Sequence, residues 1–213
     1  MTVSKSSSEA DLDALERDGF IVFDGVLGDD DLARARAAIG QLYERARKDP
    51  VWRVGGTLHL DGLIEMGEPF TAVWTDPRVV RAVRRLLGDD YRVVRAHVRS
   101  PLPGEGAQSL HADYPSRPAA GGHCVATAIV AIEPFTATNG ATRVVPGSHL
   151  ESPAGIPTDS DSSYEHEIVI TMPAGSALLF SGHLYHSGTR NRSHSWRDAL
   201  QITFARDDAR YYA

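Results

Sequence analysis

The stretch Tyr91-Arg-Val-Val-Arg-Ala-His-Val-Arg99 decides the fold, because its apolar and polar side chains alternate. The apolar set is Val94, Ala96 and Val98, and the polar set is Arg95, His97 and Arg99. Successive side chains of an extended chain point to opposite faces. This period of two therefore predicts a β-strand with one face packed on a core and one polar face.

Downstream of this stretch, further short runs rich in β-branched and apolar residues predict more strands. They are residues 123–133, 142–145, 167–171, 176–180, 184–187 and 197–205. A parallel α/β sheet would need helices between its strands, and no helical period lies between these runs. Residues 151–163, rich in Ser, Pro, Gly and Asp, are expected to form a mobile loop or lid.

Upstream, helical patterns dominate, with one short strand at residues 20–23. The predicted helices are residues 9–17, residues 32–47 after the acidic start Asp29 to Asp31, and residues 77–87 after Asp76. Helices followed by many short strands indicate a mainly β fold with flanking helices, either a double-sheet jelly roll or a barrel. Of these we expect the double-stranded β-helix (jelly roll, cupin-like). We expect one domain over residues 1–213, with 1–90 as a helical flank and 91–206 as the jelly-roll core.

Charge and composition exclude several classes of partner. The chain has 213 residues and a formal net charge of −6, without a run of Lys or Arg, so we expect no nucleic-acid partner. Cys124 is the one cysteine, which excludes an intrachain disulfide and a cysteine-based metal cluster. No export signal or membrane-length apolar run is visible, so we expect no membrane partner and a cytoplasmic location.

Two His-x-Asp triplets could carry metal chemistry, His59-Leu-Asp61 and His111-Ala-Asp113. On a strand, residues two apart share a face, so an imidazole and a carboxylate at this spacing can reach one metal ion. A histidine from a later strand, His183 or His186, would complete the two-histidine, one-carboxylate triad that suits non-haem Fe(II). Arg197 follows, and its planar guanidinium can hold a carboxylate by two hydrogen bonds.

The run Asn139-Gly-Ala-Thr-Arg-Val-Val-Pro-Gly-Ser-His149 resembles the signature of the phytanoyl-CoA dioxygenase-like (PhyH) family of Fe(II)/2-oxoglutarate oxygenases. Other pieces follow the family's order, namely Asp18-Gly-Phe-Ile-Val22, His111-x-Asp113 and Gly175…Phe180…His186…Asn191…Ser193…Arg197. The chain departs from the family at Thr138, where Glu is frequent. Together the pieces span most of the chain.

The resemblance implies a set of site residues. It assigns Fe(II) to His111, Asp113 and His186, and the C5 carboxylate of the cosubstrate 2-oxoglutarate to Arg197, with O2 as the second cosubstrate. Thr127 and Gln108 are expected to contact 2-oxoglutarate. Expected substrate contacts are His59, Arg95, His97 and Tyr114, although the stretch around His59 fits a surface loop better than the substrate entrance. His183 is expected to be structural.

The implied activity is oxidation of a small polar metabolite, by hydroxylation, desaturation or oxidative ring closure, in natural-product tailoring. Related halogenases carry a small residue where Asp113 stands, so Asp113 favours oxygen chemistry. An aminocyclitol or sugar derivative is the expected substrate type. The alternative is a cupin-like metal isomerase or a small-molecule binding module, either of which would bind metal without needing 2-oxoglutarate. A nucleic-acid demethylase is disfavoured by the net charge of −6.

Overall fold

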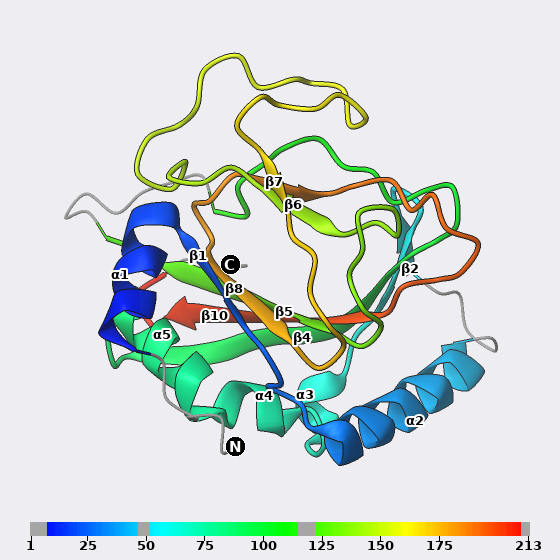
Figure 1. The fold of residues 1–213 in the computed structure, drawn as a ribbon. Helices are drawn as coiled ribbons and strands as arrows, with labels where there is room; N and C mark the ends of the chain where they lie inside the picture. Colours follow the sequence, from blue (N-terminus) through cyan, green and yellow to red (C-terminus); the bar gives the residue numbers. More distant parts are fainter. Residues whose placement is uncertain (1–7, 47–51, 115–121, 210–213) are drawn as a thin grey trace.

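Two antiparallel sheets face each other in the computed structural model, which describes residues 8–46, 52–114 and 122–209 (Figure 1). The large sheet has the strand order β1-β8-β5-β10-β4-β3-β2, and the small sheet the order β7-β6-β9. The large-sheet strands are β1 (Phe20–Phe23), β2 (Trp52–Val54), β3 (Thr57–Leu60), β4 (Tyr91–Pro101), β5 (Val125–Ala131), β8 (Ala177–Ser181) and β10 (Ala199–Arg206). The small-sheet strands are β6 (Thr142–Val144), β7 (Ile168–Val169) and β9 (His186–Gly188).

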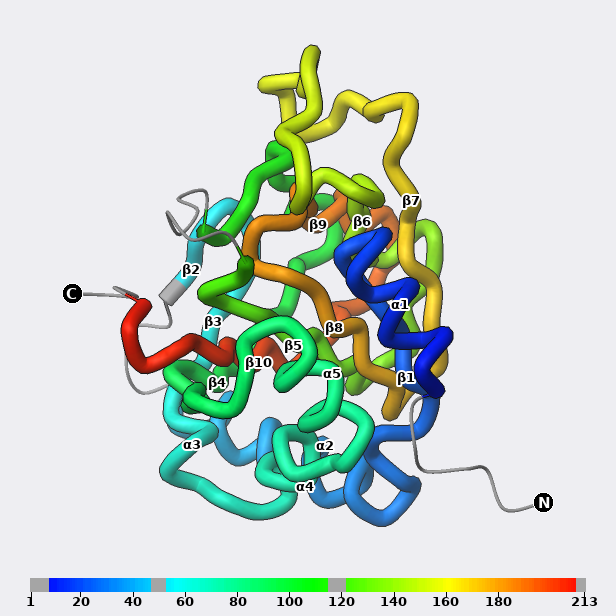
Figure 2. The backbone as a smooth tube through the Cα atoms, turned by 90° about the vertical axis from the view of Figure 1, so that its left-hand side faces the viewer, coloured from blue at the N-terminus to red at the C-terminus, as the bar shows by residue number. Residues whose placement is uncertain are grey.

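Helices cover the outer face of the large sheet, whereas a long irregular connection lies beyond the small sheet (Figures 1 and 2). The helices are α1 (Glu9–Asp18), α2 (Asp29–Ala46), α3 (Leu63–Met66), α4 (Thr71–Thr75) and α5 (Pro77–Leu87). Asp76 caps α5 by accepting the Arg78 N–H at 2.8 Å, and Pro77 occupies the first turn. The connection between β6 and β7, residues 145–167, contains no helix or strand, and its part from 150 to 167 is called the strap below.

The two faces of β5 pack against different cores. Ala126, Ala128 and Val130 belong to the core between the large sheet and the helices. Ile129 and Ala131 belong to the core between the two sheets. Because side chains alternate along a strand, polar residues that share a face with Ile129 point into the space between the sheets. That space is where the candidate site lies.

The structure confirms the mainly β fold with flanking helices and corrects its boundary. Residues 1–90 are not only a helical flank, because β1, β2 and β3 from this part join the large sheet. The stretch around His59, expected at the substrate entrance or in a surface loop, forms the β2–β3 hairpin at the sheet edge. Its turn uses Gly55 and Gly56 with φ of 55° and 73°, a conformation that favours glycine. The sequence did not predict this hairpin, because the strands on either side of the glycines are too short to show a long alternation.

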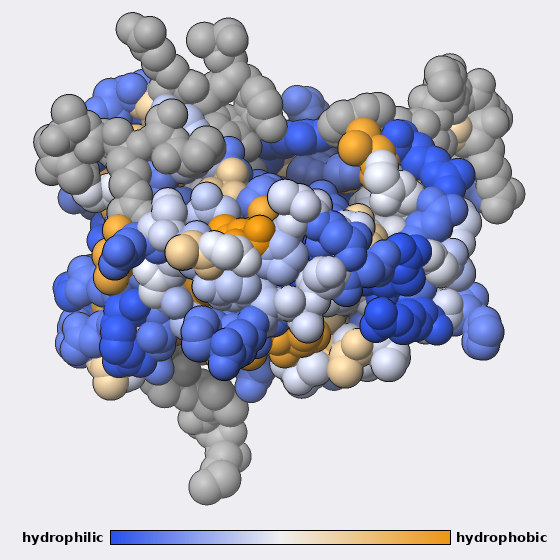
Figure 3. Space-filling model, turned by 90° about the horizontal axis from the view of Figure 1, so that it is seen from above, coloured by the Kyte–Doolittle hydropathy of each residue, from blue (hydrophilic) through white to orange (hydrophobic). Residues whose placement is uncertain are grey.

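The surface shows no extended apolar area in the view of Figure 3, where hydrophobic patches are small and separated by hydrophilic residues. The most exposed large apolar side chains in the described ranges include Leu150 and Trp196, at 59% and 50% exposure. Among the residues that the structure describes, no helix is long and apolar enough to cross a membrane.

Candidate metal centre and cosubstrate site

Two histidines meet where the loop after β4 pairs with the start of β9. The backbones of His111 and His186 exchange hydrogen bonds of 3.0 and 2.8 Å. The Nδ1 of His111 lies 2.8 Å from the Ser109 carbonyl, and the Nδ1 of His186 lies 2.9 Å from the Leu184 carbonyl. A carbonyl oxygen only accepts, so each Nδ1 carries the proton. In the neutral rings the two Nε2 atoms are therefore free to act as ligands.

Asp113 completes the cluster. Its Oδ1 lies 3.8 Å from His111 Nε2 and 3.6 Å from His186 Nε2. Within the described residues this trio is the one group of His, Cys, Asp or Glu ligand atoms that lie within 4.8 Å of one another. Burial lowers the pKa of His186 to about 4, although the charge of Asp113 opposes the shift. Two neutral imidazoles and one carboxylate fit Fe(II) and leave coordination positions open for other ligands.

Thr127 lies beside this cluster and contacts one of its candidate ligands. Its hydroxyl donates a hydrogen bond of 3.2 Å to Asp113 Oδ2, and its side chain is fully buried on β5. Thr127 thus orients the carboxylate of a candidate metal ligand, and its expected contact with 2-oxoglutarate stays a prediction.

Arg197, directly before β10, presents an incompletely bonded cation inside the protein. It is 5% exposed, its Cζ lies 3.9 Å from the centre of the Phe135 ring, and its Nη2 donates to the Gly140 carbonyl at 2.6 Å. Its Nε is buried and has no hydrogen-bond partner among the described residues. Burial and the nearby charge of Arg99 lower its pKa to about 9, so it stays a cation near pH 7. A buried guanidinium N–H without a partner can be satisfied by a carboxylate ligand, which accepts a charged hydrogen bond.

Gln108 lies on the other side of the cluster and is already engaged. Its side-chain oxygen accepts from the Arg99 guanidinium and, at 3.2 Å, from the backbone N–H of Gly188. The predicted contact with 2-oxoglutarate would therefore use the amide nitrogen of Gln108. Arg99 shares the polar face of β4 that the alternation identified, although only its neighbours Arg95 and His97 were expected to contact ligands.

The candidate substrate residues of β3 and β4 form a polar wall. The rings of His59 and His97 stack with centroids 5.3 Å apart, and His97 is 1% exposed. Burial, with the charges of Arg95 and Arg99, lowers the pKa of His59 to about 4 and that of His97 to about 2. Both rings are thus neutral near pH 7. Arg95 is paired, because its Nε lies 3.0 Å from Asp61 Oδ1.

Only one of the two His-x-Asp triplets enters a metal cluster within the described chain. His59 and Asp61 are engaged with His97 and Arg95, and neither belongs to the trio of His111, Asp113 and His186. The structure thereby separates two triplets that look alike in sequence.

His183 and Tyr114 pack against each other beside Asp113. The Nδ1 of His183 donates to the Tyr114 carbonyl at 2.7 Å, and the two rings meet edge to face at 5.8 Å. His183 lies outside the metal-ligand trio, in agreement with its expected structural role. The role of Tyr114 as a substrate contact stays a prediction.

Arg143 is a residue whose role the sequence did not reveal. It is buried, with partners on the strap, on β9 and in the segment before His111. Its guanidinium donates to Ser187 Oγ at 2.6 Å, Ser162 O at 2.7 Å, Glu167 Oε2 at 2.9 Å, Ser160 O at 3.1 Å and Gln108 O at 3.2 Å. Ser109 adds a bond of 2.8 Å to the Thr158 carbonyl of the strap. The available signal was its place within the run 139–149, which carries the family resemblance.

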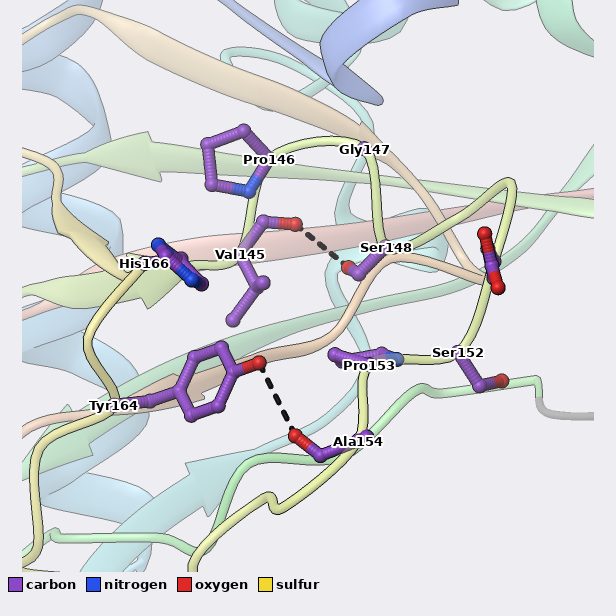
Figure 4. Close-up of a pocket in the computed structure, with 10 residues that line it drawn as sticks. Val145, Pro146, Gly147, Ser148, Ser152, Pro153, Ala154, Tyr164 and His166 are labelled. Atoms are coloured by element: carbon purple, nitrogen blue, oxygen red, sulfur yellow. Dashed lines mark hydrogen bonds between the residues drawn. The ribbon is translucent and has the colours of Figure 1, made fainter.

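A surface pocket of about 450 Å³ lies at the base of the strap (Figure 4). Pro146, Tyr164 and His166 line it, and the Tyr164 hydroxyl donates to the Ala154 carbonyl at 3.2 Å. None of the expected metal, cosubstrate or substrate residues lines this pocket. The candidate chemistry therefore lies in the space between the sheets and not here.

Sequence comparison places the chain among dioxygenases. The model of the family described as phytanoyl-CoA dioxygenase (PhyH) matches residues 15–199. Dioxygenase trt7 of Aspergillus terreus is 31% identical over 208 residues, which cover 89% of this chain and 70% of that protein.

Two solved structures share the fold. The α-ketoglutarate-dependent carbocyclase SnoK from nogalamycin biosynthesis has a TM-score of 0.77 at 19% identity, over 99% of this chain and 88% of that one. HygX from Streptomyces hygroscopicus, with nickel, 2-oxoglutarate and hygromycin B bound, has a TM-score of 0.76 at 16% identity, over 95% and 88% of the two chains. At these identities the likeness shows the fold and confirms the predicted jelly roll.

Proposed function

The chain belongs to the phytanoyl-CoA dioxygenase (PhyH) family, and from this premise we propose that it oxidises a small polar metabolite in natural-product tailoring. It is a non-haem Fe(II)/2-oxoglutarate-dependent dioxygenase, with O2 as the second cosubstrate. The observation that carries the proposal is the trio of His111, Asp113 and His186, with an incompletely bonded Arg197 in the same interior.

The site residues have three proposed roles: binding the metal, orienting its ligands and binding the cosubstrate. His111, Asp113 and His186 would hold Fe(II), which when bound supplies the activation of O2 and the oxidation of a substrate carbon. The Nδ1 hydrogen bonds of the two histidines fix the ring orientation, and Thr127 fixes the Asp113 carboxylate. Arg197 would bind the C5 carboxylate of 2-oxoglutarate through its free Nε and its remaining donors.

The interior offers hydrogen-bonding groups rather than a wholly apolar lining. His59 and His97 are neutral near pH 7, and a neutral imidazole both donates and accepts hydrogen bonds. This wall suits a substrate with hydroxyl or other polar groups. The bound hygromycin B of HygX and the carbocyclase reaction of SnoK support a polar natural product, with an aminocyclitol or sugar derivative as the proposed type. A cytoplasmic location stays a prediction.

The proposal is tested by 2-oxoglutarate turnover against a substrate panel. Purified protein with Fe(II) and O2 is given sugars, aminocyclitols, aromatic polyketides or fatty-acyl thioesters, and succinate release is measured together with the mass of each product. We expect stimulation of succinate release by polar compounds and a gain or loss of mass typical of oxidation. Turnover only with acyl thioesters would contradict the proposed substrate class.

A further inference from the structure

Arg99 is a partly buried arginine that forms no ion pair with any residue the structure describes. It lies on the inner face of β4, opposite His59 of β3 and Ala199 of β10. Within the described residues its one hydrogen bond goes to the uncharged side chain of Gln108, and no carboxylate lies within ion-pair distance. Burial lowers the pKa of its guanidinium. The side chain is thus buried enough to lose part of its hydration, and part of it remains accessible to solvent.

Two buried arginines with a structural role differ from Arg99, because each forms an ion pair with a carboxylate. Arg78 is paired with Asp76 at 2.9 Å, and Arg143 is paired with Glu167 at 2.9 Å. Removing a cation from water is costly unless a counter-charge and hydrogen bonds replace the lost hydration. Arg197, proposed to bind a carboxylate, lacks a full set of partners in the same way as Arg99. Among the described residues, neither Arg99 nor Arg197 has a carboxylate within ion-pair distance, and Arg99 shares this property with the proposed cosubstrate residue.

Arg99 also lies beside the proposed metal centre. Its partner Gln108 accepts the backbone N–H of Gly188, two residues after His186. The charge of Asp113 raises the pKa of Arg99 against the effect of burial, and the charge of Arg99 lowers the pKa of Arg197. The backbone of Arg99 is paired with that of Ala199, two residues after Arg197. Arg99 is thus close to both ends of the proposed cosubstrate site.

The charges around the metal can be counted for the site with Fe(II) and 2-oxoglutarate bound. The positive charges of Fe(II) and Arg197 are balanced by Asp113 together with the two carboxylates of 2-oxoglutarate. Asp198 and Glu133 also act on Arg197, but in the described part of the chain neither lies within ion-pair distance of Arg99, which remains a cation without a counter-charge of its own. His59 and His97 add no charge near pH 7, since burial and the neighbouring arginines keep both rings neutral. The loaded site would therefore attract one more negative charge.

We propose that Arg99 is a second anion-binding residue of this site and that it holds one carboxylate or similar acidic group. The inference rests on the proposed function. The acid can come from the primary substrate or from the end of 2-oxoglutarate nearest the metal, and the charge count favours the primary substrate. Where the acid comes from the primary substrate, the site favours those polar metabolites that carry an acidic group.

The test uses Zn(II)-loaded protein, which is redox-inert and diamagnetic. Calorimetry gives the Kd of 2-oxoglutarate, and 19F NMR of trifluoroacetate reports binding of a small carboxylate, with and without 2-oxoglutarate present. The variants are Arg99→Met, Arg99→Gln should the first fail to fold, and Arg99→Lys as a partial rescue. Arg92→Met is the matched control, because Arg92 lies on the same strand, exposed and paired with Asp207 at 2.6 Å. Circular dichroism and zinc content verify each variant.

Two results support the proposal and name the source of the acid. A tenfold or greater loss of 2-oxoglutarate affinity in Arg99→Met assigns the acid to the cosubstrate. Unchanged 2-oxoglutarate affinity, with trifluoroacetate binding to the loaded wild type lost in Arg99→Met, assigns it to the primary substrate. In both cases Arg99→Lys recovers part of the binding and Arg92→Met matches the wild type.

If Arg99→Met and Arg99→Gln alter neither Kd nor the trifluoroacetate signal, the inference is overturned while the proposed function stands. A wild-type protein that takes up metal but never binds 2-oxoglutarate contradicts the proposed function instead. The trifluoroacetate measurement without 2-oxoglutarate still decides the role of Arg99 in that case.

Discussion

At the scale of single residues, the site depends on hydrogen bonds that orient three side chains. Two backbone carbonyls select the ring nitrogens that carry protons in His111 and His186, and Thr127 holds one oxygen of Asp113. Such outer contacts commonly change metal affinity by about 10- to 100-fold. The sequence pattern identified the three side chains, whereas the tautomers and the partner of Thr127 depend on the fold.

Replacing Thr127 with Val removes the donor to Asp113 and keeps the side-chain shape. We expect metal affinity to fall by about tenfold or more, measured by competition with a chelator, while 2-oxoglutarate affinity at saturating metal stays the same. Thr203→Val is the control, because Thr203 lies opposite Thr127 on β10 and is equally buried. Unchanged metal affinity with weaker 2-oxoglutarate binding would contradict this role and support the cosubstrate contact expected from the sequence.

Replacing Arg197 with Met keeps the packing on Phe135 and removes the cation. We expect 2-oxoglutarate turnover and binding to fall by about 100-fold, in line with the loss of a bidentate charged hydrogen bond, and iron content to stay unchanged. Arg190→Met, which removes an exposed cation paired with Asp161, is the comparison. Normal turnover in Arg197→Met would refute the assignment of the cosubstrate carboxylate to this residue.

At the scale of elements, helix α2 braces the segment that carries Arg197. The Tyr43 hydroxyl donates to Asp198 Oδ1 at 2.6 Å, and the Tyr43 and Trp196 rings meet edge to face at 5.4 Å. Burial and the charge of Asp198 raise the pKa of Tyr43, so the hydroxyl keeps its proton. The strap is tied in a similar way through Arg143. Helix α2 and the strap are remote in sequence from the candidate site. Their contacts support the segments that carry Arg197 and Gln108.

Tyr43→Phe tests this brace. The change leaves the Asp198 carboxylate with one donor fewer, so we expect a loss of about 1–3 kcal/mol in the free energy of unfolding and weaker 2-oxoglutarate binding with metal affinity unchanged. Urea unfolding and calorimetry measure the two effects. Wild-type stability in this variant would show that α2 does not support the segment through this bond.

At the scale of the whole molecule, pH acts through the buried histidines. His97 is neutral in the folded protein with a pKa of about 2, against 6.5 when unperturbed. Below pH 6.5 the unfolded chain takes up a proton that folded His97 does not, so its contribution to stability is present above pH 6.5 and is lost as pH falls. From pH 7 to pH 5 this one group costs up to about 2 kcal/mol of unfolding free energy.

His97→Gln should therefore flatten the loss of stability between pH 7 and pH 5, as measured by urea unfolding at both values. His194→Gln changes an exposed histidine and is expected to keep the wild-type pH dependence. An identical pH dependence in His97→Gln would contradict a neutral, buried His97.

The sequence predicted the elements with strong patterns and left out those that depend on context. The alternation in β4 and the capped pattern of α5 are local signals, and both elements were found at or near the expected residues. The β2–β3 hairpin was missed because its strands are short and its place is set by pairing with β4. The metal trio followed from spacing and family resemblance, but the isolation of Arg99 became visible only when every neighbouring side chain had a position.

The most direct test of the central claim is an anaerobic titration of the purified protein with Fe(II) and then 2-oxoglutarate, followed by visible absorption. The account predicts a weak charge-transfer band that appears only when both are present, saturates at one equivalent of iron and is lost in His186→Ala. Bound iron without any band on addition of 2-oxoglutarate would contradict the account.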